Sequence, residues 1–110
     1  MYLRSRFTVT AMDITLLYFD SCPNWKVASD RLNILASERP DITVRHQLVD
    51  TPKKADRFEF FGSPSIQVDG VDLFAEPGSQ TGMTCRRYLT PEGYQGAPTL
   101  EQLRTVLADA

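Results

Sequence analysis

The feature that most constrains this fold is a short apolar run that leads into a cysteine. Residues 14–19, Ile-Thr-Leu-Leu-Tyr-Phe, are typical of a strand covered on both faces. Pro23 suits the first turn of a helix, because the N–H that it lacks would have no partner there, and the helix should end before Pro40. Apolar residues at helical spacing form one face of that helix: Trp25, Ala28, Leu32, Leu35 and Ala36. We therefore expect Cys22 at or beside a helix N-cap.

Cys22 is a candidate nucleophile in this position. A thiol at a helix N-terminus meets the positive end of the helix dipole, which favours the thiolate and lowers the thiol pKa. Asp20, two residues earlier, would raise that pKa if its carboxylate lies close, or it would accept the thiol proton. Both roles stay open. So does the alternative in which Cys22 is a small apolar residue closing the turn.

Composition excludes several classes of protein. The chain has 110 residues, 42% hydrophobic, with a net charge of −2, which fits one globular domain and not a nucleic-acid-binding protein. There is no apolar run of about 18 residues that would span a membrane. Residues 1–11 lack the apolar core of a signal peptide, so we expect a cytoplasmic location. We expect residues 1–12 to form an extension, either disordered or an edge strand, before a domain at 13–110.

The rest of the chain predicts an alternating α/β order. A strand at 42–49 should pair in parallel with the first strand, and a helix that starts at Thr51-Pro52 should run to about Phe60, before Gly62. An Asp-Gly pair at 69–70 predicts a hairpin over 66–74. A last helix over 99–108 should be capped by Thr99. The predicted order is β-α-β-α-β-β-α, with a long loop at 75–98 before the last helix.

This loop contains the second cysteine. The hairpin should return to the edge of the sheet that carries Cys22, so the loop should leave from that edge. Cys85 is followed by Arg86 and Arg87, which would lower its pKa. We hypothesise that Cys85 approaches Cys22, as a resolving thiol or as a second ligand for a soft metal ion. The alternative is a cysteine packed at the domain edge.

The roles of the two arginines and of the histidine are less specific. Arg86 and Arg87 would bind an anionic substrate group or lie in solvent. Two thiols and His46, the only histidine, on a remote strand do not make a four-ligand zinc site, so we expect no metal and no cofactor. Two cysteines in a chain without an export signal favour thiol chemistry over a structural disulfide.

A strand that ends in a cysteine at a helix start, a β-α-β half and a hairpin preceded by a proline together resemble the thioredoxin-like fold. The resemblance implies a mixed sheet with helices on both faces. It also implies a cis bond between Ser63 and Pro64, which would lie against Cys22 and position a substrate backbone. The chain departs from the family motif at Cys22-Pro23-Asn24-Trp25, where Trp25 replaces the second cysteine. Trp25 should pack into the core, or else stack on a substrate.

The motifs Tyr-Phe-x-x-Cys-Pro-Asn-Trp, Gly-Ser-Pro and Cys-Arg are also similar to a bacterial group of small thioredoxin-like proteins sometimes labelled alkylmercury lyase-like. That resemblance implies two thiolates that hold mercury and an acid that protonates the leaving carbon, here Cys22, Cys85 and Asp20.

Three functions follow as expectations. The first is a thiol-disulfide oxidoreductase in which Cys22 is the nucleophile, Cys85 resolves the mixed disulfide, and the partner is a protein thiol or a glutathione-like thiol. The second is a mercury or soft-metal thiol site. The third is a non-catalytic binding module.

Overall fold

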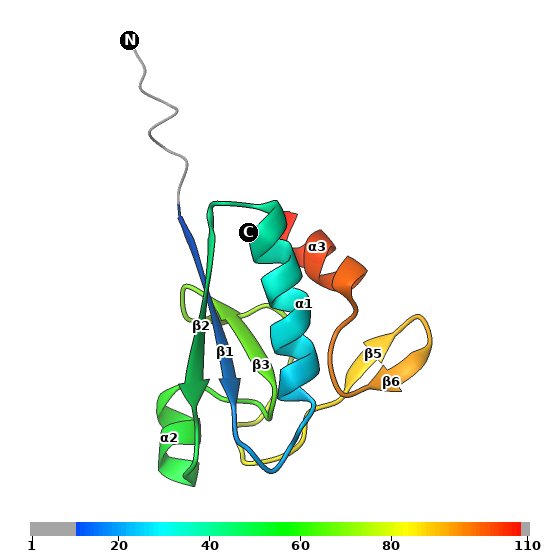
Figure 1. Ribbon diagram of the computed structural model, residues 1–110. Helices are drawn as coiled ribbons and strands as arrows, with labels where there is room; N and C mark the ends of the chain where they lie inside the picture. Colours follow the sequence, from blue (N-terminus) through cyan, green and yellow to red (C-terminus); the bar gives the residue numbers. More distant parts are fainter. Residues whose placement is uncertain (1–10, 109–110) are drawn as a thin grey trace.

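The computed structural model describes residues 11–108, and the fold is built around strand β1, Met12–Tyr18 (Figure 1). β1 pairs in parallel with β2, Ile42–Leu48, and antiparallel with β3, Ser65–Val68, which pairs antiparallel with β4, Val71–Asp72. The result is a mixed four-stranded sheet in the order β2-β1-β3-β4. The predicted central strand and its parallel partner are confirmed, although β1 starts at Met12. The predictions for residues 1–10 lie outside the described residues.

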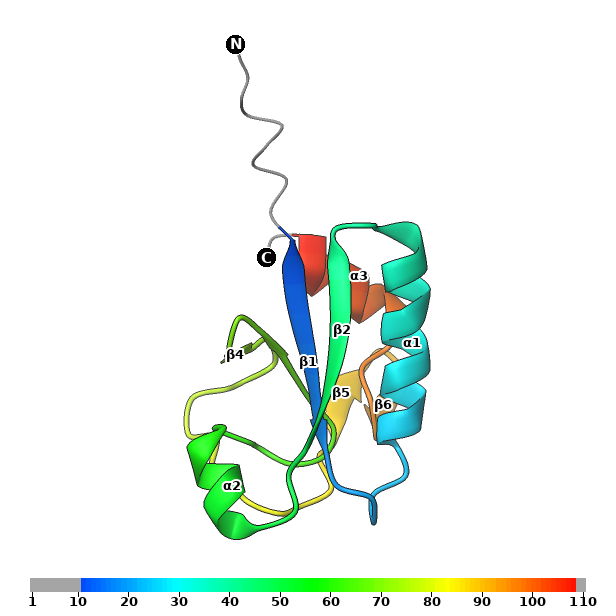
Figure 2. The ribbon, with the colours of Figure 1, turned by 60° about the vertical axis from the view of Figure 1, so that its left-hand side comes forward.

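Side chains that alternate along β1 pack into two separate clusters, one on each face of the sheet. Met12, Ile14 and Leu16 pack into the larger cluster, together with α1, Trp25–Glu38, and α3, Leu100–Ala108. Leu17 points into the smaller cluster with residues of the α2 region. Helices α1 and α3 therefore cover one face, and α2, Pro52–Arg57, lies toward the other (Figure 2). None of the helices within residues 11–108 is long and apolar enough to cross a bilayer.

Helix α1 begins later than the sequence predicted. Its N-cap is Asn24, so Cys22 lies two residues before the cap and not at it or beside it. The reason is a tighter turn ahead of the helix, in which the Lys26 N–H donates to the carbonyl of Pro23 (3.1 Å). The first α-type bond runs from the Ala28 N–H to the Asn24 carbonyl (3.2 Å). The predicted apolar face is confirmed, because its central residues, Ala28, Leu32 and Leu35, are buried.

Helix α2 has the predicted start but a different end. The Thr51 hydroxyl accepts from the Lys54 N–H (3.1 Å), which satisfies one of the free donors of the first turn. The helix ends at Arg57, well before Gly62, because Glu59 adopts a positive φ of 53° and turns the chain out of the helical path. The prediction that the helix runs to about Phe60 and that Gly62 stops it was therefore wrong.

The signals for the hairpin and the last helix are confirmed. Asp69 and Gly70 both have positive φ, 51° and 84°, as the two-residue turn between β3 and β4 requires. At the start of α3 the Gln102 N–H donates to the Thr99 hydroxyl (3.0 Å). The Thr99 N–H donates in return to Gln102 Oε1 (2.9 Å), which completes a capping box.

The predicted loop at 75–98 contains a second, smaller sheet. Strands β5, Tyr88–Thr90, and β6, Gly93–Gln95, pair antiparallel beside the N-terminal half of α1 (Figure 1). The Thr90 hydroxyl donates to the Gly93 carbonyl (2.7 Å) and closes the turn between them. Three-residue strands carry too little alternation to be recognised in a sequence, so the predicted element order lacked this hairpin.

Candidate functional site

A disulfide joins Cys22 and Cys85, which lie 63 positions apart in the chain and have 5.8 Å between their Cα atoms. Cys22 lies in the turn between β1 and α1, where its N–H donates to the Phe19 carbonyl (3.4 Å). Cys85 lies in the extended segment that precedes β5. The structure thus brings together the two cysteines that the sequence placed at the same edge of the sheet.

The two halves of the disulfide differ in exposure. Cys22 is buried, with 1% of its surface accessible, whereas Cys85 is an exposed residue. The disulfide is therefore accessible to solvent on the side of Cys85.

The peptide bond between Ser63 and Pro64 is cis, as expected, and it lies beside the Cys85 segment. Ser63 and Cys85 form a parallel bridge: the Ser63 N–H donates to the Thr84 carbonyl (2.8 Å), and the Arg86 N–H donates to the Ser63 carbonyl (2.9 Å). Ser63 is fully buried. The N–H and the carbonyl of Ser63, beside the bond that the resemblance expects to position a substrate backbone, are therefore both bonded to this chain's own residues.

Arg86 is held by a buried carboxylate. Its guanidinium donates to both oxygens of Asp72 (2.5 and 3.2 Å) and to the Ser65 hydroxyl (3.2 Å), and only 10% of the Arg86 side chain and 2% of the Asp72 side chain are exposed. Burial acts to lower the pKa of Arg86, but the hydrogen bonds to Asp72 and the neighbouring negative charges together outweigh it, and the pKa is raised. Arg86 is thus engaged inside the protein and does not lie in solvent.

Tyr88 links this ion pair to the cis peptide. The Tyr88 hydroxyl donates to the Pro64 carbonyl (2.5 Å), and the Arg86 guanidinium lies 4.7 Å from the centre of its ring. Burial raises the pKa of Tyr88. Sequence reasoning missed both Asp72 and Tyr88. No spacing in the sequence links them to Pro64 or Arg86, because the contacts arise only once the hairpin and the long loop meet.

Trp25 packs against the larger core cluster. Its ring stacks on Tyr18 (4.3 Å between ring centres) and meets His46 edge-on (6.2 Å). His46 itself is exposed on edge strand β2 and lies within hydrogen-bonding distance of the Ser29 hydroxyl (3.0 Å). The indole N–H of Trp25 is buried with no partner among residues 11–108.

A groove of about 550 Å³ adjoins both cysteine segments. It is lined by the three residues that precede Cys22, by one residue of the Cys85 segment, by the last residue of β2 and by one residue after β2: Phe19, Asp20, Ser21, Met83, Leu48 and Asp50. Asp20 is exposed and makes no hydrogen bond or ion pair within residues 11–108, whereas Asp50 pairs with Lys54 (2.9 Å). Hydrogen bonds from Lys54 lower the pKa of Asp50.

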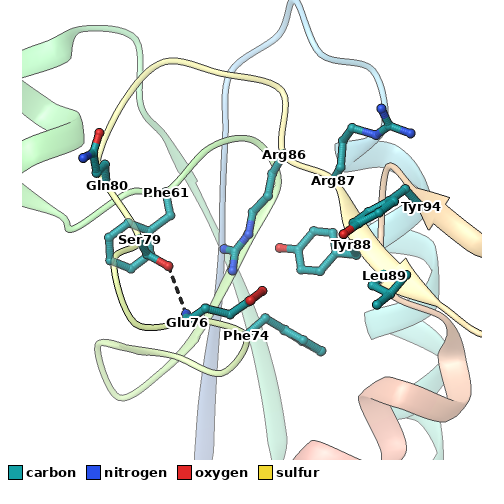
Figure 3. Close-up of a pocket in the computed structure, with 10 residues that line it drawn as sticks. All are labelled: Phe61, Phe74, Glu76, Ser79, Gln80, Arg86, Arg87, Tyr88, Leu89 and Tyr94. Carbon is teal, nitrogen blue, oxygen red and sulfur yellow. Dashed lines mark hydrogen bonds between the residues drawn. The ribbon is translucent and has the colours of Figure 1, made fainter.

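A second cavity of about 300 Å³ lies between the β4–β5 connection and the small hairpin (Figure 3). Arg86, Tyr88 and Glu76 direct their polar ends toward its centre, while Arg87 points away and lies over the Tyr94 ring (5.4 Å). Asp72 already neutralises the charge of Arg86, so Arg86 offers no unpaired positive charge to a ligand in this cavity.

Within residues 11–108 no group of three or more His, Cys, Asp or Glu side chains is placed to hold a metal ion. No protein-family model matches the sequence, and a search of curated proteins finds no significantly similar chain.

Proposed function

We propose that this protein is a thioredoxin-like thiol protein that exchanges disulfides through the Cys22–Cys85 pair. The observation that carries the proposal is the disulfide itself, formed between the β1–α1 turn and the segment beside cis-Pro64. The strand order and the helices on both sides of the sheet support a thioredoxin-like topology. The proposed relationship to the bacterial group named above rests on its short motifs alone.

The proposed reaction uses the pair as a two-electron couple. Two partner thiols reduce the disulfide to a dithiol and leave as one disulfide, or the dithiol reduces a partner disulfide in the reverse direction. In this proposal Cys85, distant in the sequence, supplies the second thiol of the redox pair. In the thioredoxin-like motif that thiol belongs to a cysteine three residues after the first. In the cytoplasm, which the sequence predicts as its location, thiols are kept reduced, so a disulfide there would be transient and catalytic.

The test is an equilibrium reaction with glutathione buffers, followed by alkylation and mass mapping of both cysteines. The proposal predicts reversible conversion between one Cys22–Cys85 disulfide and two free thiols. Cys22→Ser and Cys85→Ser should each abolish this conversion, and Ser21→Ala, which changes the neighbour of Cys22 without removing a thiol, should preserve it. A pair that never reacts in either direction would leave a non-catalytic binding module as the better account.

The adjacency of the two sulfurs also supports a second candidate, a mercury site. After reduction the pair would hold a soft ion between two thiolates, and the exposed Asp20, two residues before Cys22, would supply a proton to a leaving carbon. Release of benzene from phenylmercury, lost in Asp20→Asn and in either cysteine variant, would identify lyase chemistry. Tight binding of Hg(II) without benzene release would identify a binder.

A further inference from the structure

We infer that the partner thiolate attacks the sulfur of Cys85. The mixed disulfide with the partner then forms on Cys85, and Cys22 is the leaving thiolate. The inference rests on the proposed exchange function and deepens it. It reverses the roles expected from the sequence, in which Cys22 was the nucleophile and Cys85 the resolving thiol.

Accessibility is the first argument. A thiolate that attacks a disulfide must reach one of its two sulfurs, and the accessible one is attacked first. Cys22 has 1% of its surface exposed, so its sulfur is closed to an incoming thiol, whereas Cys85 is exposed. The burial of Cys22 thus directs the partner to Cys85.

The second argument is that the Cys85 segment is anchored without the disulfide. The residue on each side of Cys85 is bonded to the backbone of Ser63. Arg86 is fixed by Asp72, and Tyr88 by the Pro64 carbonyl. When the sulfur bond breaks, these contacts keep Cys85 facing Cys22, so Cys22 can return to displace the partner.

The same contacts define the class of partner. Extended peptides gain affinity by pairing their backbone with a free edge. The N–H and carbonyl of Ser63 are already occupied by the chain itself, so an extended peptide finds no edge there in the oxidised protein. The partner that fits is a small thiol of the glutathione type, which needs only the sulfur of Cys85.

Reduction of the protein proceeds in two thiol-disulfide exchanges. The partner thiolate forms a bond to the sulfur of Cys85, the Cys22–Cys85 bond breaks, and Cys22 keeps the electron pair as a thiolate. A second partner thiolate attacks the sulfur of the first, which releases Cys85 as a thiolate and the partner as its disulfide. The protein gains two electrons, and two partner thiols are oxidised.

The test traps the intermediate in the oxidised wild-type chain. The protein is mixed briefly with glutathione and quenched with N-ethylmaleimide, and the adduct on each cysteine is mapped by mass. We expect glutathione on Cys85 and maleimide on Cys22. The Cys22→Ser variant, whose Cys85 is a free thiol, is mixed instead with oxidised glutathione, and we expect it to accumulate the glutathione adduct on Cys85 while one glutathione thiol is released. Glutathione on Cys22 with maleimide on Cys85 would overturn the inference while leaving the exchange function intact. Reduction by no thiol at all would instead refute the exchange function.

A rate comparison tests the partner class. Reduction by glutathione is compared with reduction by an extended peptide that carries one central cysteine, both at equal thiolate concentration. Because the N–H and carbonyl of Ser63 are already bonded, we expect the peptide to reduce the disulfide no faster than glutathione does. A peptide that reacts at least about tenfold faster would show that backbone pairing contributes and would overturn the small-thiol assignment.

Discussion

Reduction of the Cys22–Cys85 disulfide should lower the free energy of unfolding substantially. The bond closes a loop whose ends are 63 residues apart. Restricting a loop of that length in the unfolded chain is worth about 4 kcal/mol in the chain-entropy relation. The reduced protein should still fold, because Ser63, Asp72 and Pro64 each hold the Cys85 segment by contacts that do not involve sulfur.

Urea unfolding of the oxidised and reduced protein, followed by tryptophan fluorescence, measures this difference. With a slope of about 2 kcal/mol per M for a chain of this size, reduction should move the midpoint down by about 2 M. The double variant Cys22→Ser, Cys85→Ser is the matched control. Its midpoint should lie near that of the reduced wild type and should not respond to reductant.

An unchanged midpoint, once alkylation has shown two free thiols in the reduced wild type, would refute a stabilising role for this disulfide. A shift of the double variant by reductant that is as large as the wild-type shift would refute it too, because the change in midpoint would then not come from this bond.

Three further predictions concern the surroundings of the site. Asp72→Ala leaves a buried guanidinium without its counter-charge and should lower the free energy of unfolding by about 3–5 kcal/mol in the same urea assay. A Cβ on Gly96 would overlap the Asn24 side chain, so Gly96→Ala should cost about 1–3 kcal/mol, whereas Gly82→Ala, which meets open space, should be nearly neutral. Because burial raises the pKa of Tyr88, the unfolded state releases its phenolic proton first, and stability should be full below pH 10.0 and fall as the pH rises above it. That loss should reach about 1.4 kcal/mol per pH unit and be absent from Tyr88→Phe.

The parts of the fold that depend on local chemistry could be predicted from the sequence. The apolar run of β1, the Thr51 and Thr99 caps and the Asp69-Gly70 turn each act through neighbours only a few residues away, and the structure has all of them. The end of α2 was not predictable in the same way. Its stop depends on a positive φ at Glu59, a residue type that seldom adopts it.

The site was predictable only where topology determines it. The return of the hairpin to the edge that carries Cys22 placed Cys85 near it. Which cysteine is buried depends on packing from several elements, and no single segment of sequence contains that information. The pairing of Arg86 with Asp72 was likewise not predictable from one segment, because these residues, 14 positions apart, meet only through the hairpin and the loop.

The central claim is that Cys22 and Cys85 form a working redox couple. It is tested most directly by titrating the wild-type protein through a series of glutathione buffers and counting the thiols on each cysteine by mass. The account predicts that both cysteines change together, in one reversible two-electron transition, between an intramolecular disulfide and a dithiol. Two cysteines that titrate independently, or that stay reduced at every potential, would contradict it.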